Sequence, residues 1–199
     1  DPRRDAYFSN QIDTSTVSGV SKLAYVGGQY GYSSPFGDYS HIAAAIQKPD
    51  FKGILFTYSE VQFYLAEAAE RGYNVPKTAE NYYNEGIRAS FAFWGVSDVD
   101  SYLANSKVAY STASGTWKQK IALQAWLALY TRGLEGYNTW RRLDYPTFNI
   151  PENWENYSDI PVRYTFPVNE QTLNAANYQA ASKAIGGDEL TTKIFWDKY

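Results

Sequence analysis

Residues 57 to 145 carry a succession of apolar stripes at helical spacing, and this feature constrains the fold more than any other. Thr57 predicts the start of the first helix as its N-cap, with Glu60 reaching back to it in a capping-box arrangement. The apolar positions of this helix are Val61, Leu65 and Ala68. Gly72 supplies a left-handed stop, so the first helix is expected to end there.

A second helix is predicted from Thr78 to Trp94, with Gly95 closing it. Its apolar stripe consists of Tyr83, Ile87, Phe91 and Trp94. Gly86 lies in the middle of this helix, where a glycine costs up to about 1 kcal/mol relative to alanine. We therefore expect another helix to pack closely against Gly86.

Further helices are predicted over residues 98–105, 117–130 and 134–143. Ser97 is the expected cap of the first, Gly133 separates the other two, and Pro146 follows the last. The inward positions of the 117–130 helix are Ile121, Ala125 and Ala128. The spacing of Ala79 and Tyr83 resembles the second helix of a tetratricopeptide-like (TPR-like) hairpin. The pattern predicts a mainly α fold with two TPR-like helical hairpins and long irregular loops.

The segments on either side of these helices are predicted to be rich in loops. Residues 1–56 contain at most short strands, around Leu23 to Val26, and residues 146–199 contain short helices at Asn169 to Leu173 and Asn177 to Ile185. No linker of low complexity divides the chain, and an apolar content of 44% suffices for a core. We expect one region over residues 1–199, with the hairpins at 57–145 between two loop-rich segments.

Composition excludes several functions. The 18 basic and 21 acidic residues give a net charge of −3, which supplies no basic field to hold nucleic acid. No apolar run approaches the ~18 to 20 residues that span a bilayer. The absence of cysteine excludes disulfides, thiolate metal sites and cysteine nucleophiles within this sequence.

No catalytic, metal or cofactor site is predicted. His41 is the single histidine and has no supporting motif, so neither a histidine metal cluster nor a Ser-His-Asp relay is indicated. Glu67, Glu70 and Arg71 are interpreted as a solvated helix face with ion-pair roles. Four acids in predicted loops lack the spacing of an EF-hand: Asp159, Asp188, Glu189 and Asp197. No pair of acids suggests a glycosidase.

Aromatic residues make up 18% of the chain, and a cluster of them between Tyr25 and His41 is the candidate ligand site. Glycine and serine separate its rings, so a regular element cannot bury them all, and glycine lets a loop approach a ligand closely. The residues expected to contact a ligand are Tyr30, Tyr32, Asp38 and Tyr39. The alternative is a tyrosine-rich loop that only covers the helices.

Several blocks of sequence occur in the same order as in a known family. They are DPR at 1–3, EVQFYLAEAAERG at 60–72, WRRLDYP at 140–146, RYTFPVNEQTLNAANYQ at 163–179 and GGDELTTKIFWDKY at 186–199. Together they resemble the carboxy-terminal part of the SusD/RagB family, the outer-membrane nutrient-binding lipoproteins of Bacteroidetes. The resemblance implies a SusD-like superhelical α fold with a TPR-like framework.

The resemblance also implies a function without catalysis. Such a protein binds an oligosaccharide or other nutrient at the cell surface and delivers it to a SusC-like TonB-dependent transporter in the outer membrane. Because this sequence has neither methionine nor cysteine, we expect the signal peptide and acylated cysteine of a lipoprotein to lie outside it. The alternative function is a TPR-like protein-interaction module that binds no small molecule, and a glycoside hydrolase ranks last.

The terminal block is expected to be structural. Trp196 is predicted to insert against the helices. Ion pairs are predicted to pin the terminal segment to the helices, and their residues are Arg141, Arg142, Arg163 and Glu170.

Overall fold

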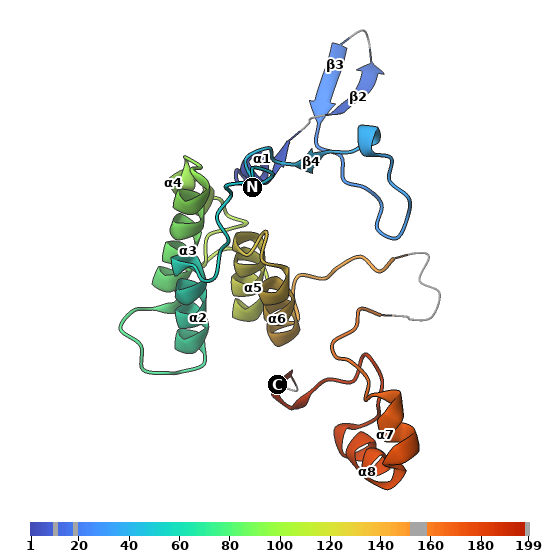
Figure 1. Cartoon of the computed structure of the whole chain (residues 1–199). Coiled ribbons are helices and arrows are strands. Elements are labelled where there is room, and N and C mark those ends of the chain that lie inside the picture. Colours follow the sequence, from blue (N-terminus) through green and yellow to red (C-terminus); the bar gives the residue numbers. More distant parts are fainter. Residues whose placement is uncertain (10–11, 18–19, 152–158, 198–199) are drawn as a thin grey trace. The chain divides into compact units, whose positions relative to one another are not determined.

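The computed structural model describes residues 1–9, 12–17, 20–151 and 159–197 (Figure 1). The chain divides into two compact units, Asp1–Thr147 and Phe148–Tyr199, which we describe separately. The described residues are mainly helical, as predicted from the sequence.

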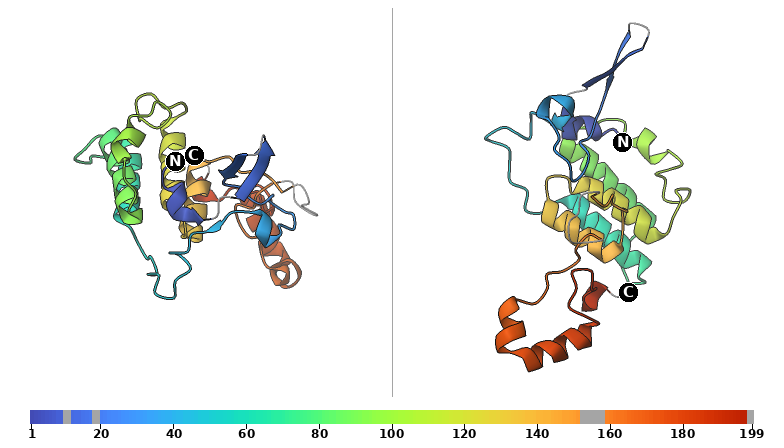
Figure 2. Two further views of the ribbon diagram at one scale, coloured as in Figure 1. Left: turned by 90° about the horizontal axis from the view of Figure 1, so that it is seen from above. Right: turned by 90° about the vertical axis from the view of Figure 1, so that its right-hand side faces the viewer.

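The first unit is built on four helices (Figure 2). They are α2 (Tyr58–Glu70), α3 (Ala79–Trp94), α5 (Trp117–Ala128) and α6 (Gly133–Leu143). Helix α2 packs against α3 and α5, while α5 also packs against α6. The consecutive pairs α2–α3 and α5–α6 therefore form the two predicted hairpins.

Local capping sets the ends of these helices. The Thr57 and Thr78 hydroxyls each accept a hydrogen bond of 3.2 Å from the backbone N–H three residues on. A complete capping box occurs at Thr116 and Gln119 instead of at Thr57. Gly95 ends α3 with φ +65, as predicted.

The core lies between α2, α3 and α5. Its apolar members include Phe63, Ala66, Tyr83, Ile87, Phe91, Ile121, Ala122, Ala125 and Leu143. The predicted stripe of α3 is confirmed at Tyr83, Ile87 and Phe91. The predicted stripe of α2 lies at the edge of the core, because Val61, Leu65 and Ala68 are half-buried and Leu65 packs against the core cluster. The buried face of α2 combines Phe63 and Ala66 with buried polar side chains such as Ser59 and Glu60, a mixture that apolar periodicity does not detect.

Helices α2 and α3 approach each other closely at Gly86. A Cβ atom at this position would lie 2.9 Å from two carbon atoms of the buried Phe63 ring. The Ser59 hydroxyl also donates a hydrogen bond of 2.7 Å to the Gly86 carbonyl. The close packing expected from a mid-helix glycine is confirmed.

Replacing Gly86 by leucine is expected to destabilise the helical unit. The new side chain must displace the Phe63 ring, and such overpacking typically costs about 1 to 3 kcal/mol. Gly133→Leu is the matched control, because a Cβ at Gly133 has no heavy atom within 4 Å among the described residues. Urea unfolding should show a lower midpoint for Gly86→Leu only. Equal midpoints for Gly86→Leu and the parent would contradict this packing.

The helix predicted over residues 98–105 is shorter in the structure. Helix α4 spans Val99–Leu103, and the left-handed Asp98 precedes it with φ 62. The Ser97 hydroxyl donates a 3.1 Å hydrogen bond to the Asp98 carboxylate, so Ser97 is not the N-cap. Asp98 occupies the N-cap position instead, and the Ser97 hydroxyl is hydrogen-bonded to the Asp98 carboxylate.

The amino-terminal segment is more regular than its sequence indicated. It contains α1 (Arg4–Tyr7), β1 (Phe8–Ser9), β2 (Ile12–Val17), β3 (Val20–Ala24), the 3-10 helix η1 (Phe36–Asp38) and β4 (His41–Ile42). Strands β1 and β4 pair antiparallel, as do β2 and β3. The strand expected around Leu23 to Val26 corresponds to β3, which begins earlier and ends before Val26.

The second unit contains α7 (Val168–Leu173), α8 (Ala175–Ile185) and the 3-10 helix η2 (Phe195–Asp197). Arg163 forms an ion pair of 3.0 Å with Asp188, which also accepts a hydrogen bond of 3.0 Å from the Phe166 backbone. These contacts tie the terminal block to residues 163–166. The last two residues of that block lie outside the described part of the chain.

Residues expected to pin the terminal segment to the helices make contacts within their own units, and the pinning itself stays a prediction. Arg142 pairs with Glu67 of α2, and Arg141 donates a 2.5 Å hydrogen bond to Asn138. Glu170 is exposed and accepts a hydrogen bond of 2.8 Å from Asn174. Trp196 lies in η2 with 39% of its surface exposed, and its insertion against the helices stays a prediction.

Candidate ligand-binding site

A buried arginine fixes the amino-terminal segment to the helices. The Arg3 guanidinium donates to Asp1 at 2.6 Å, to Ser90 of α3 at 3.0 Å and to Gln124 of α5 at 2.7 Å. It also lies over the rings of Phe91 and Tyr102. The side chain is fully buried, so these partners replace the water that the cation has lost.

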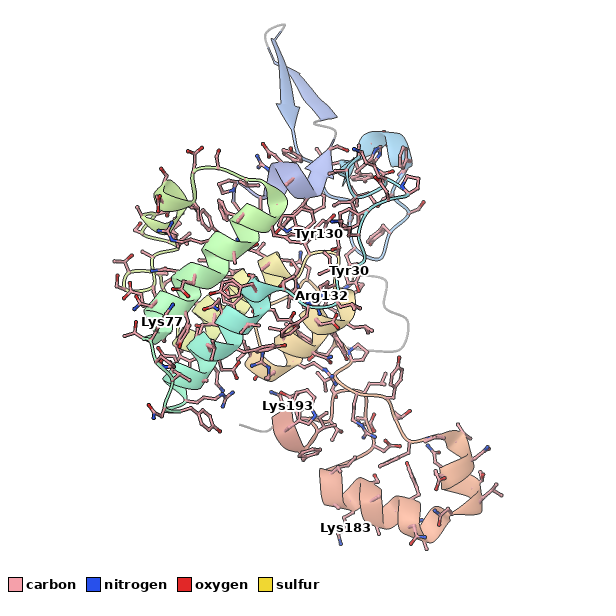
Figure 3. All side chains as sticks on the ribbon, turned by 60° about the vertical axis from the view of Figure 1, so that its left-hand side comes forward. Tyr30, Lys77, Tyr130, Arg132, Lys183 and Lys193 are labelled. Carbon is pink, nitrogen blue, oxygen red and sulfur yellow. The ribbon has the colours of Figure 1, made fainter. Side chains whose placement is uncertain are left out.

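An aromatic cluster around Tyr7 continues from this anchor to strand β1. The buried Tyr7 hydroxyl donates to the Leu127 carbonyl at 2.7 Å, and the Tyr7 ring stacks on Tyr130 with 4.4 Å between centroids. Trp94 of α3 meets Tyr7 edge-on at 4.8 Å. Burial raises the pKa of both tyrosine hydroxyls above their ordinary value. Figure 3 labels Tyr130, which lies beneath α1 in that view.

Two hydrogen bonds between Val26 and Ser40 join the two ends of the predicted ligand loop, a pair of residues that we call its neck. The Val26 N–H donates to the Ser40 hydroxyl at 2.9 Å, and the Ser40 N–H donates to the Val26 carbonyl at 2.8 Å. Tyr25, beside this neck, lies over the Arg4 guanidinium at 4.2 Å. A loop held at both ends in this way can present side chains at a defined place.

The structure places all four predicted contact residues on this loop. Tyr30 and Tyr32 are 63% and 42% exposed on either side of Gly31, which has φ 86, and Tyr30 is labelled in Figure 3. Asp38 is exposed in η1, while Tyr39 is half-buried. No regular element brings the four side chains onto a common face, so their joint role as a ligand site is a proposal.

Phe36 and His41 have a structural role within the loop. Their rings stack with centroids 3.5 Å apart, and a His41 ring nitrogen lies 2.6 Å from the Phe36 carbonyl. The backbone contact holds the histidine in place. His41 therefore braces η1 against β4.

A large apolar groove was missed by the sequence analysis. It has a volume of about 1310 Å³ and lies between residues 48–59 and the carboxyl end of α3. The groove lining includes Leu55, Phe56 and Phe93, and the Leu55 side chain is 91% exposed. The available signal was the run FKGILF at 51–56, which is too apolar for a segment expected to be an irregular loop.

Helix α1 contributes to both the groove and the base of the ligand loop. Arg4 contacts Tyr25 of the loop, whereas the next two residues, Asp5 and Ala6, line the groove. Both surfaces thus depend on the segment that Arg3 anchors. An exposed apolar surface of this size is typical of a site that contacts another molecule.

Acidic side chains between the helices are engaged by arginines. Glu60 and Arg132 form a buried ion pair, and Glu67 pairs with both Arg71 and Arg142. Tyr64 donates to Glu60 at 3.1 Å, and burial raises the pKa of this tyrosine. The interpretation of Glu67 as part of a solvated face is wrong, because the fold buries it between two arginines.

Potential metal ligands do not cluster in the part of the chain that the structure describes. Among the described residues, no group of three or more His, Cys, Asp or Glu side chains is arranged to hold a metal ion. Two of the loop acids considered as ligands, Asp188 and Asp197, pair with Arg163 and Lys193. Within the same described residues, no helix combines the length and the apolar character needed to cross a bilayer.

These features describe a class of protein in which helical hairpins form a rigid scaffold and aromatic side chains lie on its surface. A family model described as "Starch-binding associating with outer membrane" matches residues 1–167. The chain therefore belongs to the SusD-like family. No curated protein matches the sequence significantly.

Solved structures of the same family resemble this one. A SusD homologue from Bacteroides thetaiotaomicron is 26% identical with a TM-score of 0.75, over 100% of this chain and 49% of that protein. A chitin-binding SusD homologue from Flavobacterium johnsoniae is 26% identical with a TM-score of 0.72, over 99% and 46%. A Bacteroidetes SusD-like protein is 32% identical with a TM-score of 0.67, over 80% and 33%. The chain spans about half the length of the first two and a third of the last.

Proposed function

We propose that this chain belongs to a non-catalytic glycan-binding protein at the surface of the outer membrane. The description of its family names starch binding, and one of its structural relatives is a chitin-binding SusD homologue. The observation that carries the proposal is the pair of exposed rings, Tyr30 and Tyr32, on a loop closed at its neck. Tyrosine offers a flat apolar face for the C–H groups of a sugar and a hydroxyl for hydrogen bonding.

The proposed contacts follow from the chemistry of the loop. Tyr30, Tyr32 and Tyr39 supply ring faces, while the exposed Asp38 carboxylate accepts hydrogen bonds from sugar hydroxyls. The protein would hold an intact oligosaccharide and deliver it to a SusC-like TonB-dependent transporter. A lipid anchor preceding this sequence would keep it at the membrane.

Truncating the ring side chains is expected to weaken glycan binding. We predict that Tyr30→Ala, Tyr32→Ala and Tyr39→Ala each raise the Kd by about 2- to 12-fold, the effect of losing one aromatic contact. Calorimetry on the full-length protein with a panel of starch and chitin oligosaccharides measures this change. Tyr73→Ala is the matched control, because Tyr73 is exposed in the loop between α2 and α3.

The outcome separates a ligand site from a covering loop. If a bound sugar is found and all three variants bind it as tightly as the parent, the loop only covers the fold. Release of reducing ends from the glycan by the pure protein would contradict the absence of catalysis.

The second candidate function is a TPR-like protein-interaction module. The exposed groove favours it, because Leu55, Phe56 and Phe93 present apolar surface suited to another polypeptide. Leu55→Asp distinguishes the two functions: it should abolish association with a partner protein while leaving the Kd for a glycan unchanged. A loss of glycan affinity in this variant would instead assign the groove to sugar binding.

A further inference from the structure

A second, polar pocket lies at the amino end of α5, within the first unit. Its volume is about 220 Å³, and residues 113–115 of the loop joining α4 to α5 form one wall. The polar side chains that line it include Lys107, Ser114, Gln119, Lys120 and Tyr145. No aspartate or glutamate is among the described residues of the lining.

The pocket is locally cationic although the chain as a whole is acidic. Two ammonium groups line it, while the net charge of the chain is −3. Within the described part of the chain, Lys107 is exposed and forms no ion pair. The nearby Glu70 carboxylate accepts a 2.5 Å hydrogen bond from Tyr110 and does not line the pocket. The positive charge is therefore available to an anion.

Lys120 is held in place before any ligand binds. Its ammonium donates to the Tyr110 carbonyl at 2.7 Å and lies 5.4 Å from the centre of the Tyr110 ring. An ammonium has three N–H donors, so two are left to point at a ligand. Fixing a long side chain in advance reduces the entropy that binding costs.

The wall around Gln119 is equally fixed. Its side-chain oxygen accepts a hydrogen bond of 2.8 Å from the Thr116 N–H in the capping box, which leaves the amide NH₂ able to donate. Gly115 packs against this side chain with φ +94, and a Cβ there would lie 2.5 Å from the Gln119 oxygen. The left-handed backbone conformation favours glycine at this position.

From this geometry we propose that the pocket binds an acidic sugar unit, a monosaccharide ring carrying a carboxylate or a sulfate group. The lining is rich in donors, which suits the acceptor oxygens of such a group and of sugar hydroxyls. The volume corresponds to about seven water molecules of liquid, the size class of one sugar ring. The Tyr145 side chain also lines the pocket. This inference rests on the proposed glycan-binding function and specifies a substrate class for it.

The test compares acidic and neutral probes on the full-length protein by calorimetry. Glucuronate and glucose 6-sulfate should bind more tightly than glucose, and inorganic sulfate more weakly than glucose 6-sulfate. Lys120→Gln should weaken glucuronate binding by about 10-fold, the effect of losing a hydrogen bond to a charged group. Lys107→Gln should weaken it by about 2- to 5-fold, because this lysine is exposed.

Lys118→Gln is the matched control, since Lys118 lies on α5 and does not line the pocket. It should leave the Kd for glucuronate unchanged. Circular dichroism checks that Lys120→Gln is folded, and Lys107→Gln tests the same pocket without removing a structural contact.

The results distinguish this inference from the proposed function. Equal affinity for glucuronate and glucose, or an equal loss in Lys118→Gln, overturns the acidic-sugar pocket. If neutral oligosaccharides still bind and respond to the loop tyrosines, the proposed function stands alone. If no neutral or acidic glycan binds, both proposals fail.

Discussion

Replacing Glu60 by glutamine is expected to cost about 3 to 5 kcal/mol of the free energy of unfolding. Glu60 and Arg132 are both buried, and their ion pair joins α2 to the residue that precedes α6. Removing the carboxylate leaves the Arg132 cation in a dry site, with the more exposed Glu135 at 3.4 Å as its remaining acidic partner. A domain typically has only about 5 to 15 kcal/mol of stability, so this loss should be easily detected in urea unfolding.

The double variant Glu60→Gln, Arg132→Met is the control for this first prediction. It removes the stranded charge, so it should be more stable than Glu60→Gln alone. A double variant that is as unstable as the sum of the two single variants would contradict coupling between the two side chains.

Replacing Arg3 by methionine is expected to have a comparable effect, again about 3 to 5 kcal/mol. The change leaves Ser90 and Gln124 buried without their cationic donor, and it removes the anchor of the amino-terminal segment. Because Arg3 holds this segment against α3 and α5, limited proteolysis should cut the segment before β4 much faster in this variant.

Arg4→Met is the matched control, because the neighbouring Arg4 is exposed and its pair with Asp5 is at the surface. Such exposed pairs contribute about 0 to 1 kcal/mol, so Arg4→Met should unfold like the parent. Equal stability of Arg3→Met and Arg4→Met would mean that the buried arginine does not anchor the segment.

The ligand loop could be placed from the sequence, but its surroundings could not. Glycine and serine between tyrosines predicted exposed rings, and Tyr30 and Tyr32 are exposed. The groove is different, because its walls come from residues 48–59 and from the end of α3. Only the packing of α3 against the rest of the unit brings them together. The polar pocket is missed for the same reason. Its two lysines form a cationic site only because the fold places no aspartate or glutamate among the described lining residues, and the sequence does not show this.

The sequence by itself determined where the main helices lie and several of their ends. Thr57, Thr78 and Gly95 act through hydrogen bonds and backbone angles within four residues, so their effect is readable locally. Gly86 likewise predicted a close contact, because glycine in a helix interior needs a reason.

The tertiary structure alone decided the partners of the buried charges. Glu60 was expected to complete a capping box and instead pairs with Arg132, 72 residues away. Arg3 finds Gln124 across a separation of 121 residues. A cap is favoured by local geometry, whereas a charge removed from water is stabilised only by an opposite charge or a set of hydrogen-bonding groups. Which groups are within reach depends on how the helices pack, and this information is not contained in any local pattern of the chain.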